Sequence, residues 1–74
     1  MSESRETTRD RVWLHVLEET MRNGNVVDAS SVAEAADCSR KTAREVLKVM
    51  DRQRWIRERS TSRGIEYHPE YRMN

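Results

Sequence analysis

The stretch that decides the fold is residues 38–48, which read CSRKTAREVLK. Ser39 is a favoured residue for capping the start of a helix, and neither proline nor glycine interrupts the residues after it. The pattern predicts an amphipathic helix from Arg40 to about Gln53, because apolar residues recur on one side of it and cations on the other. The predicted inner face consists of Ala43, Val46, Leu47 and Met50. The predicted outer face carries Arg40, Lys41, Arg44 and Lys48.

A shorter helix is predicted just before this one, over Ala29–Ala36. Asp28 lies where an N-cap is needed, and Ser31 can return the hydrogen bond weakly. Ser31 with Glu34 forms a rival capping box, which would start the helix later. Residues 37–39 leave only a tight break before the basic helix. A short helix, a turn and a longer helix in succession have the spacing of a helix-turn-helix. The predicted inner face of the short helix is Val32, Ala33 and Ala36.

A further helix is predicted nearer the N-terminus, from Asp10 to Met21, with Thr8 or Asp10 as its cap. Asn23-Gly24 provides the usual stop signal. Residues 25–28 then read as a short extended piece. The predicted inner face of this helix is Val12, Trp13, Val16, Leu17, Thr20 and Met21.

After the basic helix the apolar period shortens to that of a strand. Trp55–Ser60 alternates around Ile56, and Ile65–His68 alternates again. Between them, residues 61–64 form a polar turn cluster that contains glycine, so the two runs predict a β-hairpin. Pro69 stops the second strand or confines it to an edge. The predicted fold class is therefore α+β, in the order α-β-α-turn-α-β-β.

The 74 residues suffice for one domain. We expect a flexible polar leader over residues 1–9, the folded domain over 10–69 and a tail over 70–74. One cysteine excludes an intrachain disulfide, and no apolar run is long enough for a signal peptide or a membrane span. These features indicate a soluble, cytoplasmic protein. We expect no cofactor, metal or small-molecule ligand, since His15 and His68 with Cys38 do not make a convincing zinc site.

The charges are distributed unevenly along the chain, although the net charge is only +1. Residues 1–38 contain four basic and eight acidic residues, a net charge of −4. Residues 39–74 contain ten basic and five acidic residues, a net charge of +5. Such asymmetry favours a polyanionic partner for the second half.

Residues 27–67 read VDASSVAEAADCSRKTAREVLKVMDRQRWIRERSTSRGIEY. They carry a resemblance to the winged helix-turn-helix family of DNA-binding domains that covers roughly Asp10 to Tyr67. The likeness is greatest to the compact forms found in archaeal and bacterial transcription regulators. One residue departs from the pattern, because the family usually has glycine where this chain has Arg54. The residues that match family positions are Ala33, Cys38, Ser39, Thr42, Ala43, Leu47, Met50, Trp55 and Ile56.

The resemblance implies sequence-specific binding of double-stranded DNA, with the basic helix in the major groove and the hairpin as a wing on the backbone or minor groove. Arginine or lysine can donate to guanine O6 and N7. The implied contacts from the recognition helix are Ser39, Arg40, Lys41, Thr42, Arg44 and Lys48. The implied contacts from the wing are Arg57, Arg59, Ser62 and Arg63.

Other interpretations of the same residues stay open. The cationic face can be ordinary solvated charge, and a winged helix can serve as a protein–protein interaction module. A replication, plasmid or virus accessory protein that binds DNA would have the same sequence features. An enzyme is not expected, because no phosphate loop or nucleophile–base pattern occurs. Trp13 and Trp55 suit core or dimer contacts, and a homodimer would use the first helix and the C-terminal segment, with Trp13, Leu14 or Tyr71 as anchors.

Overall fold

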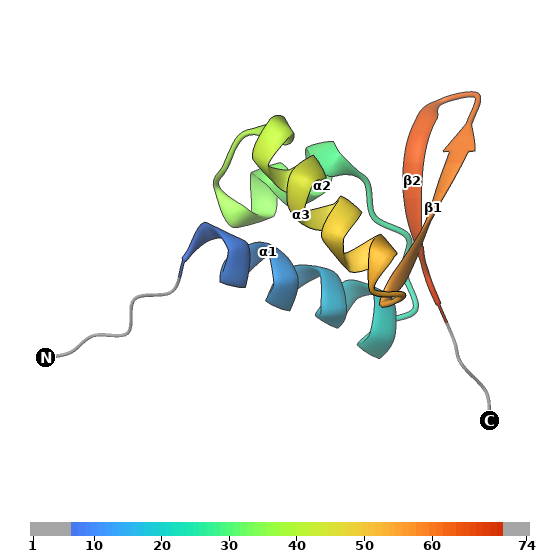
Figure 1. Ribbon diagram of the computed structural model, residues 1–74, viewed down its shortest axis with the longest axis horizontal. Helices are drawn as coiled ribbons and strands as arrows, with labels where there is room; N and C mark the ends of the chain where they lie inside the picture. Colours follow the sequence, from blue (N-terminus) through green and yellow to red (C-terminus); the bar gives the residue numbers. More distant parts are fainter. Residues whose placement is uncertain (1–6, 71–74) are drawn as a thin grey trace, which may run out of the picture.

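Three helical segments and a C-terminal hairpin follow one another in the predicted order, which confirms the α+β class (Figure 1). The computed structural model describes residues 7–70, so Tyr71 and most of the leader and tail lie outside the described residues. The hairpin stands beside one end of the helices, and the extended segment before α2 runs next to it. The elements are α1 (Thr8–Leu17), η1 (Glu18–Arg22), α2 (Ala29–Ala36), α3 (Arg40–Arg52), β1 (Ile56–Thr61) and β2 (Gly64–Pro69).

The start of α1 differs from the prediction. The helix begins at Thr8, and its cap is Thr7 rather than Thr8 or Asp10. The Asp10 N–H donates to Thr7 Oγ1 at 3.1 Å. A side-chain oxygen at the N-cap satisfies an amide that has no partner inside the helix. The prediction therefore named the wrong cap, because neighbouring threonines and an aspartate are all residue types that cap helices.

The end of the first helix also differs, because Glu18–Arg22 forms a π-helical turn. Thr20 is fully buried there, and its hydroxyl donates to the Val16 carbonyl at 2.8 Å. A threonine hydroxyl commonly donates to the carbonyl four residues earlier in a helix, and this bond satisfies the buried hydroxyl. Met21 is 51% exposed, so its predicted place on the inner face is wrong.

The capping box of α2 is formed by Asp28 and Ser31, as predicted. The Ser31 N–H donates to Asp28 Oδ1 at 2.8 Å, and the Asp28 N–H donates to Ser31 Oγ at 3.4 Å. The rival start with Glu34 is therefore excluded. At the other end, Asp37 closes α2 in the left-handed conformation with φ of 57°. A short polar side chain tolerates this conformation better than most.

The core lies where the three helices meet the inner face of the hairpin. All the residues predicted for the inner faces of α2 and α3 are buried, which confirms the phase of both helices. From α1 only Val12 and Val16 among the apolar residues are fully enclosed. Trp13, Leu17 and Cys38 pack against this core while partly exposed. The remaining core residues are Val27, Ile56 and Tyr67.

The hairpin is antiparallel and pairs Glu58 with Tyr67 and Thr61 with Gly64. β1 starts at Ile56, one residue later than predicted, and continues through Thr61. The connecting turn therefore consists of residues 62–63 alone, rather than the predicted 61–64. A two-residue loop is the commonest hairpin connection, since its twist matches that of the strands.

A single bridge between Val27 and Tyr67 adds the segment before α2 to the outer edge of β2. Pro69 lies two residues further along β2, so its nitrogen faces the same side as that of Tyr67 and away from β1. The ladder between β1 and β2 therefore loses no hydrogen bond to the proline. On the other edge, the Glu58 N–H donates to Asp51 Oδ1 of α3 at 3.0 Å, which fixes β1 against the helix.

Candidate nucleic-acid interface

The start of α3 is organised by Ser39 and Thr42. Ser39 Oγ accepts a hydrogen bond from the Thr42 N–H at 3.1 Å and donates to Thr42 Oγ1 at 2.9 Å. The predicted cap is thus confirmed. Both hydroxyls, which the sequence singled out as candidate contacts, also hold the helix end together. Ser39 is exposed and Thr42 is half-buried.

The outer face of α3 is a continuous basic surface. Its residues occur at helical spacing, and each of them is exposed. They line a surface depression of about 380 Å³ and give it four positive charges against one negative charge from Glu45. The four cations are Arg40, Lys41, Arg44 and Lys48.

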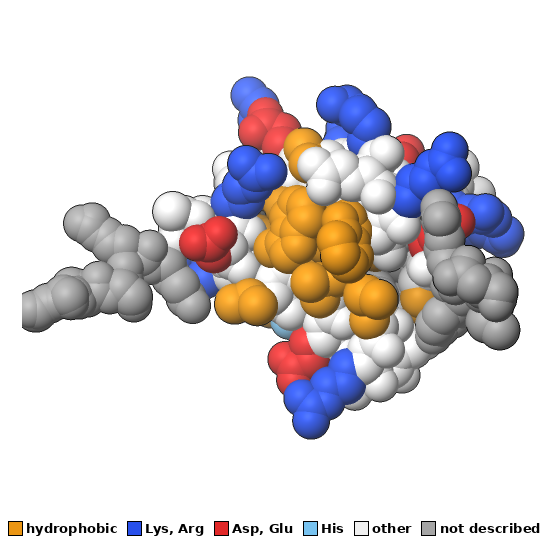
Figure 2. All heavy atoms as spheres, turned by 60° about the horizontal axis from the view of Figure 1, so that its bottom comes forward, with side chains coloured by type: hydrophobic (Ala, Val, Ile, Leu, Met, Phe, Trp, Pro, Cys, Tyr) orange, Lys and Arg blue, Asp and Glu red, His pale blue; other side chains and the backbone are white. Residues whose placement is uncertain are grey.

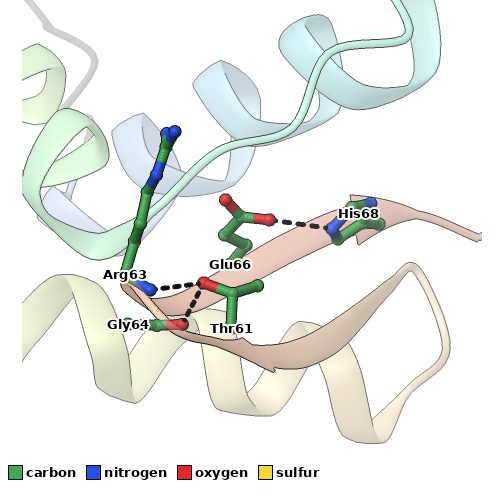
Figure 3. Close-up of polar contacts among 5 residues, drawn as sticks. All are labelled: Thr61, Arg63, Gly64, Glu66 and His68. Atoms are coloured by element: carbon green, nitrogen blue, oxygen red, sulfur yellow. Dashed lines mark hydrogen bonds and ion pairs between the residues drawn. The ribbon is translucent and has the colours of Figure 1, made fainter.

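The tip of the wing is shaped by Thr61 (Figure 3). Its Oγ1 accepts from the Arg63 N–H at 3.1 Å and donates to the Gly64 carbonyl at 2.8 Å. Gly64 has φ of 132°, a conformation that side chains disfavour. This closed turn leaves Ser62 and Arg63 exposed at the tip. The structural role of Thr61 was not recognised in the sequence, although a threonine before a two-residue turn was a usable signal.

The wing tip and α3 meet across one cleft of about 410 Å³. Arg40 and Arg44 line it from α3, and Arg63 lines it from the wing. Residues 28–30, at the start of α2, form another wall, and residues 64–67 of β2 complete it. Three predicted contact residues from segments about twenty positions apart are therefore brought together.

Two carboxylates in this cleft were missed by the sequence reading as parts of the site. Asp28 and Glu66 both line it. Asp28 is occupied by the α2 capping box, and Glu66 Oε1 lies 3.2 Å from His68 Nε2 (Figure 3). Glu66 lies in a short strand of alternating apolar and polar residues, and no sequence pattern distinguished it as a residue of the site. The cleft therefore carries three positive side chains and two negative ones, and it is less basic than the outer face of α3.

Tyr67 lies in β2, where the wing borders this cleft beside α3. Its side chain is 1% exposed, and its hydroxyl makes no hydrogen bond among residues 7–70. Burial raises the pKa of the Tyr67 phenol, and the neighbouring Glu58 carboxylate raises it further. The positive charge of Arg44 acts in the opposite direction. Arg44 thus lies close enough to the wing to interact with it electrostatically.

Arg57 and Arg59 are placed apart from the cleft. The alternation of β1 turns Ile56 inward and puts the two arginines on the outer face of the wing. Arg57 Nε lies 3.2 Å from Glu70 Oε1, and both arginines line a different depression, with His68 and Pro69. The structure therefore separates the four predicted wing contacts into tip residues and outer-face residues.

No group of three or more His, Cys, Asp or Glu side chains within residues 7–70 is arranged to hold a metal ion. None of the helices in that range has the length and apolar character needed to cross a membrane.

The helix-turn-helix followed by a hairpin defines a winged-helix-like architecture. Comparisons with family models, curated proteins and solved structures found no match to this chain.

Proposed function

We propose that this chain binds double-stranded DNA through the outer face of α3 and the tip of its wing, as a small transcription regulator. The observation that carries the proposal is the meeting of Arg40, Arg44 and Arg63 at one cleft. If the charged face of α3 were only solvated, no basic residue from another helix or strand would be expected beside it. Here a turn held by its own hydrogen bonds presents a further arginine to the same side as the cationic helix.

The charge and shape of α3 suit the major groove, which admits one helix. Arg40, Lys41 and Arg44 belong to its first turns, the part that reaches base edges in helix-turn-helix proteins. Arginine in this position can donate two hydrogen bonds to one guanine. Lys48 lies further along the helix, where contact with a phosphate is more favourable than contact with a base.

The wing tip would then follow the sugar–phosphate backbone or enter the minor groove. Ser62 and Arg63 are the exposed residues of the turn, and an arginine is attracted by the enhanced negative potential of a narrow groove. Arg57 and Arg59 face elsewhere, and Arg57 already has a carboxylate partner. We propose that these two contribute less to DNA binding than the residues at the cleft.

Fluorescence anisotropy of a labelled mixed-sequence duplex tests this proposal, with the apparent association constant measured at several salt concentrations. The wild type should show a linear fall of log K with log[salt], at a slope of about −0.9 per phosphate neutralised. The double variant Arg40→Glu/Arg44→Glu should lose most of the affinity. Arg57→Glu/Arg59→Glu makes the same change of charge on the outer face of the wing, and it should lose much less.

Two results would count against the proposal. An absence of wild-type binding at about 50 mM salt would reject DNA as the partner. Equal losses in the two double variants would show that the attraction depends on total charge and not on the face formed by α3 and the wing tip. The remaining candidate would then be a protein-binding winged helix.

A further inference from the structure

One side of α1 and η1 exposes an apolar stripe that the core does not use. Leu14 is 59% exposed and Met21 is 51% exposed, while Trp13 and Leu17 are only half-buried. Trp13 and Leu14 are four and three positions before Leu17 on α1, so the three lie on one side of it, and Met21 is exposed on η1, which continues that helix. Charged residues would ordinarily occupy such positions on a surface helix.

Trp55 extends this stripe from α1 to the end of α3. Its side chain is 39% exposed, and its ring packs edge-on against Trp13, with ring centroids 6.4 Å apart and planes at 71°. The Arg9 guanidinium lies over the other ring, 5.7 Å from the Trp13 centroid. We call Trp13, Leu14, Leu17, Met21 and Trp55 the apolar patch. Figure 2 shows hydrophobic side chains gathered on the corresponding face, with charged groups around them.

We propose that the apolar patch is the contact surface for a second copy of this chain, in a two-fold symmetric dimer. Exposed patches of a few hundred Å² are commonly interaction sites. A stable interface buries about 800 Å² on each partner, and a little over half of that area is apolar. The apolar patch includes two tryptophans, a residue type enriched in the energetically dominant positions of such interfaces.

The charges around the patch favour a second copy over a highly charged partner. Arg9 and Asp10 lie at one end of the stripe, and Glu18 and Arg22 lie at the other. Glu18 Oε2 and Arg22 Nη1 are 3.6 Å apart, so each end of the stripe on α1 and η1 carries one charge of each sign. A two-fold interface requires a surface that complements itself. The outer face of α3 fails this requirement, because two copies of it would bring like charges together.

The patch shares no residue with the proposed DNA interface, so a dimer would keep both copies of α3 free. This consequence rests on the proposed function. Two-fold dimers of helix-turn-helix proteins read two half-sites in inverted orientation, about one helical turn apart. The dimer itself is tested without DNA, so the two proposals can fail separately.

Sedimentation velocity over protein concentrations from about 5 µM to about 500 µM measures the dimer directly, since dimerisation follows mass action. Leu14→Glu and Met21→Glu are the test variants, because both side chains are exposed and their replacement spares the core. Each should raise the dimer dissociation constant at least about tenfold by placing a charge in an apolar contact. Ala35→Glu introduces the same charge at an exposed position of α2 and is the matched control.

Circular dichroism should show the same helix content in all variants. Wild-type tryptophan fluorescence should shift to the blue as the dimer forms, because Trp55 becomes buried. A wild type that stays monomeric throughout the concentration range overturns the proposal, and the patch would then serve a different protein. If Leu14→Glu and Met21→Glu leave the dimer intact, the apolar patch is not the dimer contact surface. Dimerisation without DNA binding would support this inference and reject only the proposed function.

Discussion

Val27 and Tyr67 exchange both of their backbone hydrogen bonds. The Tyr67 N–H donates to the Val27 carbonyl at 2.8 Å, and the Val27 N–H donates to the Tyr67 carbonyl at 3.0 Å. This pair joins the segment that leads into α2 to the second strand of the wing. Because α2 starts two residues after Val27, the pair also sets the distance between the helix-turn-helix and the wing. Tyr67 and the residues that follow Val27 are also among the residues that line the cleft between Arg40 and Arg63.

Amide hydrogen exchange followed by NMR should show that connection. The Tyr67 amide should exchange slowly, because it is bonded to Val27 and its residue is buried. Ile65 provides the control, since its N–H faces the same edge of β2 without a bridge partner. Its exchange should be faster by at least about tenfold. Equal exchange of the two amides would mean that the bridge is not maintained in solution.

Arg54 has φ of 69°, so the residue between α3 and the wing adopts the left-handed conformation. The winged helix-turn-helix family, which the sequence resembles, usually has glycine at this position. Arg54→Gly should raise the free energy of unfolding by up to about 1 kcal/mol, because glycine adopts this conformation without a steric penalty. Arg54→Ala removes the same side chain but keeps the penalty, so it should give no gain. Chemical denaturation distinguishes the two, and equal effects would assign the change to the lost side chain.

Leu47 is fully buried on the inner face of α3. Leu47→Ala should lower the free energy of unfolding by about 2–5 kcal/mol, because it removes buried methyl groups and leaves a cavity. Val49→Ala is the control on the same helix, and its half-buried side chain should cost less. Thermal unfolding followed by circular dichroism measures both. An unchanged melting temperature for Leu47→Ala would contradict the phase of the helix.

Tyr67 should make stability fall at alkaline pH. Its folded-state pKa is raised above 10.0, first by burial and then by Glu58, so the folded protein holds the phenol proton more tightly than the unfolded chain. The resulting stabilisation is complete below pH 10 and is lost as the pH rises through the folded-state pKa. Tyr67→Phe should remove this dependence. The variant should lose little stability at neutral pH, because the hydroxyl it deletes has no hydrogen bond within residues 7–70.

Measuring the free energy of unfolding of both proteins from neutral pH to above pH 10 tests this prediction. A decline of the same size in Tyr67→Phe would assign the alkaline loss to other groups.

Much of the local structure could be predicted because neighbouring residues decide it. Asp28 and Ser39 are caps in the sequence and in the structure, since a capping side chain reaches only a few positions along the chain. The faces of α2 and α3 follow from apolar spacing. The π-turn over Glu18–Arg22 was missed, because no local pattern in these residues distinguishes it from a continuing α-helix. DNA binding and dimerisation stay predictions.

The sequence by itself determined the order of the elements, the caps of α2 and α3 and the separation of basic from apolar surface on α3. These features follow from interactions between residues a few positions apart and from the helical repeat of apolar residues in the sequence. Only the tertiary structure decided which arginines act together. Arg63 joins Arg40 at the cleft, whereas Arg57 and Arg59 line a separate depression. The physical reason is that strand register and the bridge from Val27 to Tyr67 join segments far apart in the chain, and side-chain packing selects that pairing.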